Sequence, residues 1–152
     1  MITIIDYGVG NINAFVNVYK RVDVPVKIAK TAADLEGAEK LILPGVGHFD
    51  HAMNQLNNSG MREKLDDLVL NQKIPVIGIC VGMQMMANNS DEGEVEGLKW
   101  IDATVKKFDE TKIHQVTRLP HMGWNDVKPV KDISLFQGLE KEAIFYFLHT
   151  YY

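Results

Sequence analysis

Cysteine is almost missing from this chain: Cys80 is the only one among 152 residues, so an internal disulfide cannot form. A single thiol suits a reducing compartment, and we expect the protein to work in the cytoplasm. Long hydrophobic runs are also missing, since no apolar stretch reaches the roughly 20 residues of a membrane-spanning helix. The first residues, 1–6, lack a basic region and meet an acid at once, which indicates a strand rather than a signal peptide. We therefore expect no contact with a membrane.

Concentrated positive charge is the next feature that the chain lacks. Acidic and basic residues are mixed, the formal net charge is -4, and no lysine and arginine block exceeds two residues. Nucleic-acid binding needs a basic surface, so we expect no nucleic-acid partner. Histidines, acids and the cysteine do not cluster with zinc-ligand spacing, so we expect no metal. Repeats, low-complexity tracts and linkers are absent, which favours a single domain over 1–152.

Buried-strand patterns alternate with helical patterns through the first half of the chain. The apolar runs predict strands at 2–5, 24–29, 40–43 and 76–79. Helical spacing predicts helices at 11–21, from 31, at 49–71 and at 81–88, the third burying Met53, Leu56, Met61, Leu65, Leu68 and Val69. This order indicates an α/β fold, a mostly parallel sheet flanked by helices.

The second half of the chain changes character. Strand-like patterns occur at 98–108, 114–118, 127–130 and 143–148, separated from the first half by a polar turn at 88–97. They predict antiparallel hairpins beside the main sheet.

The segment Gly78-Ile79-Cys80-Val81-Gly82 has the Gly-x-nucleophile-x-Gly pattern of a sharp strand-to-helix turn, with cysteine in place of serine. Side chains at both flanking positions would collide in so tight a turn, which is why glycine is needed there. The thiol would lie exposed at the strand's tip, and the helix behind it would favour the reactive thiolate. A lone cysteine is usually a small core residue. Here the flanking glycines and the preceding strand favour a nucleophile.

A second glycine pair, Gly45-Val46-Gly47, follows the third predicted strand. Most such pairs are plain turns, but an elbow enzyme builds its oxyanion hole from this loop and from the N–H after the nucleophile, here Val81. Because ligands bind at the carboxyl ends of parallel strands, we expect 6–8, 44–47 and Cys80 to converge. The pair Gly8 and Gly10 lacks the third glycine and the acid of a dinucleotide site, so we read it as a tight turn that opens a helix.

An elbow nucleophile needs a base, and the chain offers five histidines for this role. His48 and His51 begin the long helix and should be solvated, His114 should face the surface of a strand, and His121 lies in an expected turn with an exposed tryptophan. His149 ends the last strand and is the only formal candidate, because this base comes from a loop after a late strand. Most single histidines are nevertheless structural or surface residues.

Five segments together resemble the class I glutamine amidotransferases, and among these the glutaminase subunits of imidazole glycerol phosphate synthases. They fall in the family's order, span the whole chain and read IDYGVGN at 5–11, LPGVGHF at 43–49, GICVGMQ at 78–84, PHMGWN at 120–125 and HTYY at 149–152. The elbow alone indicates the class, and the segments PGVG and PHMGWN narrow it to this subunit.

The resemblance implies a flavodoxin-like fold, no cofactor, and hydrolysis of L-glutamine to glutamate and ammonia through a thioester on Cys80. It implies that the ammonia passes along a closed path to a (β/α)8-barrel cyclase or synthase subunit in histidine biosynthesis. The implied residues are Gly47 and Val81 for the oxyanion, Gln84, Glu92, Thr150 and Tyr151 for glutamine, and His121, Trp124 and Asn125 for the partner.

The chain departs from the family in two places. Val81 stands where leucine is usual, which changes volume but not backbone chemistry. The family's catalytic histidine and glutamate belong to a Phe-His-Pro-Glu-Lys-Ser type segment, and no His-Pro-Glu occurs in these 152 residues. We therefore expect the chain to be truncated at its C-terminus and residues 1–152 alone to be inactive as a glutaminase.

Three other functions stay open at this point. The chain could be a paralogue that supplies ammonia for surface-polysaccharide sugar amination, or a non-catalytic subunit without its base. A peptidase or gamma-glutamyl hydrolase could share the scaffold, although the segment at 120–125 argues against it.

Overall fold

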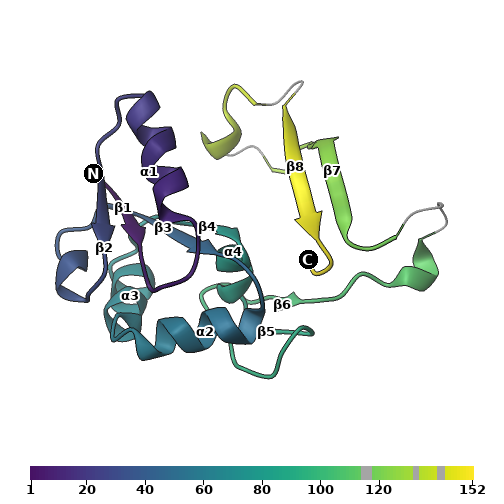
Figure 1. The fold of residues 1–152 in the computed structure, drawn as a ribbon, viewed down its shortest axis with the longest axis horizontal. Coiled ribbons are helices and arrows are strands. Elements are labelled where there is room, and N and C mark those ends of the chain that lie inside the picture. Colours follow the sequence, from purple (N-terminus) through teal and green to yellow (C-terminus); the bar gives the residue numbers. More distant parts are fainter. Residues whose placement is uncertain (114–117, 132–133, 140–142) are drawn as a thin grey trace. The chain divides into compact units, whose positions relative to one another are not determined.

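The computed structural model describes residues 1–113, 118–131, 134–139 and 143–152, which divide into two compact units, Met1–Lys106 and Lys107–Tyr152. The first unit is an α/β layer structure and the second is built on a two-stranded hairpin (Figure 1). Among these described residues, no helix has the length and apolar character needed to cross a membrane.

A four-stranded parallel sheet forms the centre of the first unit. Its strands are β1 (Ile2–Ile5), β2 (Val26–Ala29), β3 (Lys40–Gly45) and β4 (Val76–Cys80), in the order β2-β1-β3-β4. All three pairings are parallel, and the last one places Gly45 opposite Cys80. The prediction of a mostly parallel sheet is confirmed, with the second strand beginning at Val26 rather than at residue 24.

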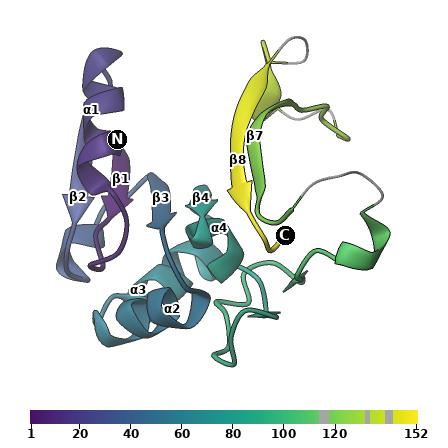
Figure 2. The same cartoon turned by 45° about the vertical axis from the view of Figure 1, so that its right-hand side comes forward.

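Helices cover both faces of this sheet. Helix α1 (Ile12–Arg21) lies on one side, and α2 (Phe49–Asn58) and α3 (Arg62–Asp66) lie on the other (Figures 1 and 2). The short helix α4 (Val81–Met85) directly follows β4. The main core lies on the α2 side, where apolar side chains of the sheet meet those of α2, α3 and α4. Its fully buried members include Ile5, Leu41, Leu43, Phe49, Met53, Leu56, Met61, Leu65 and Met85.

The predicted long helix at 49–71 is wrong as a single element, although its apolar face is buried as expected, with Val69 only partly so. Helix α2 ends at Asn58 because Gly60 takes a φ of 73°, a left-handed conformation that ends helices. Ser59 fixes the break, since its Oγ donates to the Leu56 carbonyl (2.7 Å) and accepts from the Met61 N–H (3.1 Å). The chain then continues as α3 and the π-helical turn η2 (Asp67–Asn71).

The helix after the elbow is also shorter than predicted and ends at Met85. The carbonyls of Met85 and Met86 accept from the N–H groups of Leu98 (2.7 Å) and Trp100 (2.9 Å), which caps the helix. For the same reason 98–108 is not a strand, apart from β6 (Thr104–Val105). That strand pairs in parallel with β5 (Asn89–Ser90), against the expectation of antiparallel hairpins here.

The short helix expected from residue 31 is the 3-10 turn η1 (Ala33–Leu35). The carboxylate of Asp34 accepts from the Thr31 N–H (2.9 Å), and Thr31 Oγ1 accepts from the Asp34 N–H (3.3 Å). This reciprocal pair is the predicted capping box.

The second unit contains the antiparallel pair β7 (His121–Asp126) and β8 (Ile144–His149), with the 3-10 turns η3 (Glu110–Lys112) and η4 (Ser134–Phe136). The antiparallel prediction is confirmed here. The turn expected at 119–125 is wrong from His121 onward, because residues 121–126 pair with β8. The expected strand at 127–130 does not form, and the one at 114–118 falls mainly outside the described residues, with His114.

Candidate active site

Cys80 ends β4, directly precedes α4 and has an exposed side chain. Its φ of 56° and ψ of -123° lie outside the regions that L-residues ordinarily adopt. Such a conformation costs about 1–3 kcal/mol and persists only where the surrounding structure imposes it. The exposed thiol on a strained strand-to-helix turn is the geometry that the sequence predicted.

The glycines around Cys80 are required by steric contact. A Cβ on Gly78 would lie 2.4 Å from the Met83 Cα, and one on Gly82 would lie 2.0 Å from the Leu43 carbonyl oxygen. Both distances are far shorter than real contacts allow, so the prediction that neither position tolerates a side chain is confirmed.

Gly45 is a third position that cannot bear a side chain, although the sequence indicated it only as part of a turn or an oxyanion loop. A Cβ there would lie 2.2 Å from the backbone nitrogen of Gly82. β3, β4 and α4 therefore meet backbone to backbone beside the thiol.

Tyr7, which follows β1, links the end of that strand to the point where β3 and α4 meet. Its O–H donates to the Pro44 carbonyl (2.7 Å) and lies 3.3 Å from the Met85 sulfur, in a buried setting. Burial raises the pKa of Tyr7 far above its ordinary value, so the hydroxyl remains a donor. The predicted convergence of the strand ends is confirmed. The sequence signals for Tyr7 were its place after the first strand and its inclusion in the segment IDYGVGN at 5–11.

The two expected oxyanion residues differ in setting. Val81 is buried and opens α4, so its N–H directly follows the thiol in the chain. Gly47 lies in the exposed loop between β3 and α2, with a φ of 83° that favours glycine.

The expected glutamine contacts divide between the units. Gln84 lies in α4, one turn beyond the thiol, and is 9% exposed. The half-buried Glu92 has its Oε2 accepting from the Phe49 N–H at 2.9 Å, at the start of α2. Thr150 and Tyr151 belong to the second unit, where the Thr150 carbonyl accepts from the Phe108 N–H and Tyr151 bridges to Lys107.

The hairpin separates the three expected partner-binding residues onto two faces. Trp124 pairs with Tyr146 across the strands, their rings 5.5 Å apart, and Met122 pairs with Leu148 on the same face. His121 and Asn125 lie on the opposite face because side chains alternate along a strand.

A chain of hydrogen bonds joins the polar groups on the face that carries His121 and Asn125. His149 Nδ1 donates to the Tyr151 carbonyl (2.8 Å), which can only accept, so in the neutral ring Nε2 accepts from His121 Nδ1–H (3.0 Å). The remaining nitrogen of His121 then accepts from the amide group of Asn125 (3.1 Å). Both nitrogens of His149, the formal base candidate, are thus engaged inside the hairpin unit.

His48 and His51 are exposed, as expected at the start of α2. His48 also caps this helix, because its Nδ1 accepts from the Asp50 N–H at 3.2 Å.

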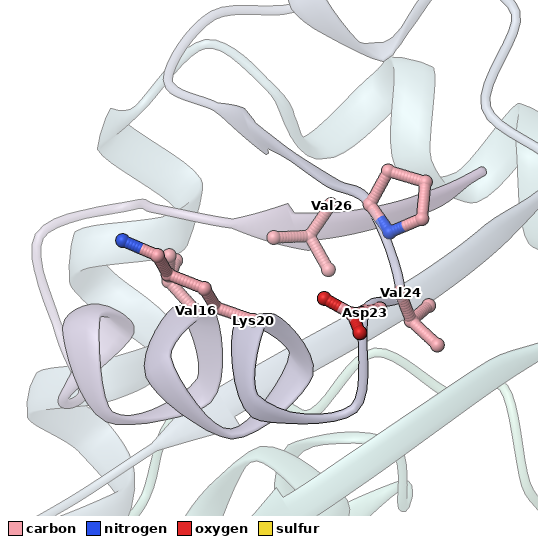
Figure 3. Close-up of a pocket in the computed structure, with 6 residues that line it drawn as sticks. Val16, Lys20, Asp23, Val24 and Val26 are labelled. Carbon is pink, nitrogen blue, oxygen red and sulfur yellow. The ribbon is translucent and has the colours of Figure 1, made fainter.

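Metal-ligand clusters and pockets are other features that could mark a functional site. In the described ranges, no three His, Cys, Asp or Glu side chains gather as metal ligands would. An open pocket of about 370 Å³ lies at the end of α1 and the start of β2 (Figure 3). It is lined by Val16, Lys20, Asp23, Val24, Pro25 and Val26, at the strands' amino ends and away from Cys80. The elbow, not this pocket, is the candidate site.

Comparison with known proteins gives a match over almost the whole chain. The model of the family "Glutamine amidotransferase class-I" matches residues 3–152. A protein of Bdellovibrio bacteriovorus named "Imidazole glycerol phosphate synthase subunit HisH" is 59% identical over 152 residues, covering 100% of this chain and 74% of its own. A protein of the same name from Leptospira borgpetersenii is 50% identical with the same coverage.

A solved structure titled "Crystal structure of glutamine amidotransferase" has a TM-score of 0.61 and 20% sequence identity. The match covers 70% of this chain and 56% of that one. At this identity the likeness concerns the fold, and it agrees with the parallel sheet and the flanking helices.

Proposed function

On the premise that this chain belongs to the class-I glutamine amidotransferase family, we propose that it is the glutaminase subunit of an imidazole glycerol phosphate synthase. In this role it hydrolyses L-glutamine to glutamate and ammonia for histidine biosynthesis in the cytoplasm. The observation that carries the proposal is the strained, exposed Cys80 between two glycines that cannot bear a side chain. The names of the two similar relatives support the choice of pathway.

The thiolate of Cys80 attacks the side-chain amide carbon of glutamine, and a tetrahedral intermediate forms. N–H groups of Val81 and of the Gly47 loop would stabilise its oxyanion. Collapse of the intermediate breaks the carbon–nitrogen bond, releases ammonia and leaves a thioester. Water then hydrolyses the thioester to glutamate and frees the thiol. Each proton transfer in this sequence needs a general base.

For that base we propose a histidine with its glutamate in a segment after residue 152, within a longer protein. The support is that the similar relatives are longer, with 74% of their length matched. The amino-acid end of glutamine would be held by Gln84 and Glu92, together with Thr150 and Tyr151.

Ammonia must reach its acceptor without entering bulk water, where it would be protonated and lose its nucleophilicity. We therefore propose a (β/α)8-barrel synthase subunit as the partner, contacted by His121, Trp124 and Asn125. The exposed face of the hairpin supports this for Trp124, which is 67% exposed and lies beside Met122, which is 58% exposed. Exposed aromatic and methionine side chains are typical of protein interfaces.

The test uses the protein expressed from its whole gene, together with its synthase subunit. Diazo-oxo-norleucine, a glutamine-like electrophile, should label Cys80 stoichiometrically, and glutamine should protect it. The matched control is Cys80→Ala, which should take no label at this position. Absence of labelling in the wild-type complex would refute the nucleophile.

The same preparation tests the pathway, and protein limited to residues 1–152 tests the position of the base. Glutamine-dependent turnover should require the acceptor substrate of histidine biosynthesis, and turnover only with a sugar acceptor would favour the paralogue instead. Protein limited to residues 1–152 should release no glutamate at a steady rate, and steady release would overturn the proposed position of the base.

A further inference from the structure

Asp50 holds the turn that carries Glu92. Its side chain lies in the first turn of α2, and its two carboxylate oxygens accept from consecutive backbone N–H groups 44 and 45 positions later. Oδ2 accepts from Glu94 at 3.1 Å, and Oδ1 accepts from Val95 at 3.0 Å. A carboxylate that accepts from two successive backbone N–H groups fixes both the distance and the orientation of the segment that supplies them.

Gly93 shows how closely this contact is fitted. A Cβ at residue 93 would lie 1.9 Å from Asp50 Oδ1, 2.3 Å from Cγ and 2.6 Å from Oδ2. Its three nearest atoms therefore all belong to the one carboxylate. The φ of Gly93 is outside the left-handed range, so an alanine would meet no conformational obstacle there. Asp50 itself is what requires glycine at this position.

Glu92 is hydrogen-bonded to Phe49, the residue that precedes Asp50 in the first turn of α2. Its Oε2 accepts from the Phe49 N–H (2.9 Å), and Phe49 is fully buried in the core. The Ser90 Oγ accepts from the Glu92 N–H (3.1 Å) on the other side. The Glu92 carboxylate is thus held at the start of α2, at the end of the loop that contains Gly47.

We infer that Asp50 is a positioning residue for glutamine binding: it fixes the 90–95 turn so that Glu92 meets the amino-acid end of the substrate. This inference rests on the proposed function, which assigns Glu92 to glutamine. Glu94 is exposed, and Val95 packs against the core while remaining half-buried, so Asp50 supplies the side-chain contacts that fix the backbone of these two residues. Loss of the carboxylate would leave two N–H groups without their acceptor and would release the turn.

The experiment measures inactivation by diazo-oxo-norleucine in the whole-gene protein with its synthase subunit. The inactivation rate is measured against the concentration of the reagent. The half-saturating concentration reports recognition of the amino-acid end, and the maximal rate reports the reactivity of the Cys80 thiol. Asp50→Ala should raise the half-saturating concentration about tenfold and leave the maximal rate within about twofold, as expected for lost charge-assisted hydrogen bonds at a half-exposed group. Alkylation by iodoacetamide, which has no amino-acid end, should be unchanged.

Gly93→Ala provides the second arm of a double-mutant cycle. It should raise the half-saturating concentration when Asp50 is present, because the new methyl displaces the carboxylate. In the Asp50→Ala background it should add little, because the atoms that it would meet are gone. The two single effects should therefore be strongly non-additive.

Asp34→Ala is the matched control. Its carboxylate also accepts from two consecutive backbone N–H groups, those of Lys30 (3.0 Å) and Thr31 (2.9 Å), but at the end of the edge strand β2. Loss of the same kind of contact there should leave the inactivation constants of Cys80 unchanged.

The outcomes separate the two proposals. If diazo-oxo-norleucine does not inactivate the wild type, the proposed function and this inference both fail. If it does, but Asp50→Ala has the wild-type half-saturating concentration, only this inference fails. Should Asp50→Ala not fold, Asp50→Asn decides, because it keeps the volume and one acceptor oxygen. A folded Asp50→Asn with wild-type recognition would overturn the inference, and a several-fold loss would support it.

Discussion

Replacing Gly82 by alanine would set two effects of opposite sign against each other. Gly82 lies in α4, and alanine favours a helix interior over glycine by about 1 kcal/mol. The added Cβ, however, would lie 2.0 Å from the carbonyl oxygen of Leu43 and 2.9 Å from the carbonyl carbon of Pro44. Both are backbone atoms of β3, so no side chain can rotate away and the strand or the helix must move by roughly 1 Å.

The steric effect should be the larger one. Overpacking typically costs about 1–3 kcal/mol, and more where backbone has to shift. Because the clash here is between backbone atoms, we take its cost as about 3–5 kcal/mol, so after the gain of about 1 kcal/mol in helix propensity Gly82→Ala should lower the free energy of unfolding by about 2–4 kcal/mol. That is a large share of the roughly 5–15 kcal/mol that stabilises a typical domain. For a protein of this size it corresponds to a fall in Tm of roughly 6–12 °C.

Urea unfolding of the whole-gene protein measures this difference, and Gly37→Ala is the control. Gly37 also has a special backbone, with a φ of 71°, but a Cβ there would meet no atom within 4 Å. Gly37→Ala should therefore cost only the left-handed strain, about 1 kcal/mol. If Gly82→Ala proved as stable as the wild type, the backbone contact of β3 with α4 would not be what requires glycine beside Cys80.

Three further predictions concern aromatic side chains. Tyr7→Phe should lower the free energy of unfolding by about 1–2 kcal/mol in urea, because the Pro44 carbonyl loses its buried donor. Burial raises the pKa of Tyr7 above the unfolded value of 10.0, so the wild type should lose part of its advantage over Tyr7→Phe as the pH rises above 10.0, and a constant difference would contradict this. Trp100→Phe removes the donor to Asp66 Oδ1 (2.6 Å) and should cost about 1 kcal/mol in the same assay. Trp124→Ala should weaken binding of the synthase subunit about 10- to 100-fold by calorimetry, with stability unchanged, and an unaltered Kd would place the interface elsewhere.

The parallel sheet and the elbow could be predicted because their signals are local. A strand buried on both faces reads as a largely apolar run, as 2–5 does. The apolar run at 76–79 predicted a strand as well, although β4 is only partly buried and Ile77 is 40% exposed. The glycines two positions before and after Cys80 likewise predict a sharp turn from residues that are neighbours in the sequence. The steric need for Gly45 could not be read in this way, because the atom that it must avoid belongs to Gly82, far along the chain.

Long-range hydrogen bonds account for most of the wrong boundaries. The alternation at 98–108 predicted a strand, but Leu98 and Trp100 give their N–H groups to the end of α4 instead. The segment PHMGWN contains a proline and a glycine, which are typical of turns, but from His121 onward it forms a strand because β8 pairs with it. The break at Gly60 is different, since a serine and a glycine in sequence are a local helix-ending signal that was available.

The candidate site was predictable to a similar extent. Cys80 and the strand-end residues around it follow from the elbow, whereas Glu92 and the hairpin residues depended on a family resemblance. Asp50 could not be found from the sequence, because its partners, the N–H groups of Glu94 and Val95, are backbone atoms that exist at every position. Only the fold shows which of them meet a carboxylate.

The positive φ of Cys80 also limits which nucleophile the elbow can carry. A β-branched side chain is a poor fit at a φ of 56°, since a second heavy atom on Cβ crowds the backbone. Serine has the same branching as cysteine and can occupy the turn, while threonine would have to relax it. Cys80→Ser thus changes the chemistry at a fixed backbone, and Cys80→Thr changes the backbone too. The backbone conformation at Cys80 therefore favours nucleophiles without a branch at Cβ, such as cysteine and serine, whichever reaction the site catalyses.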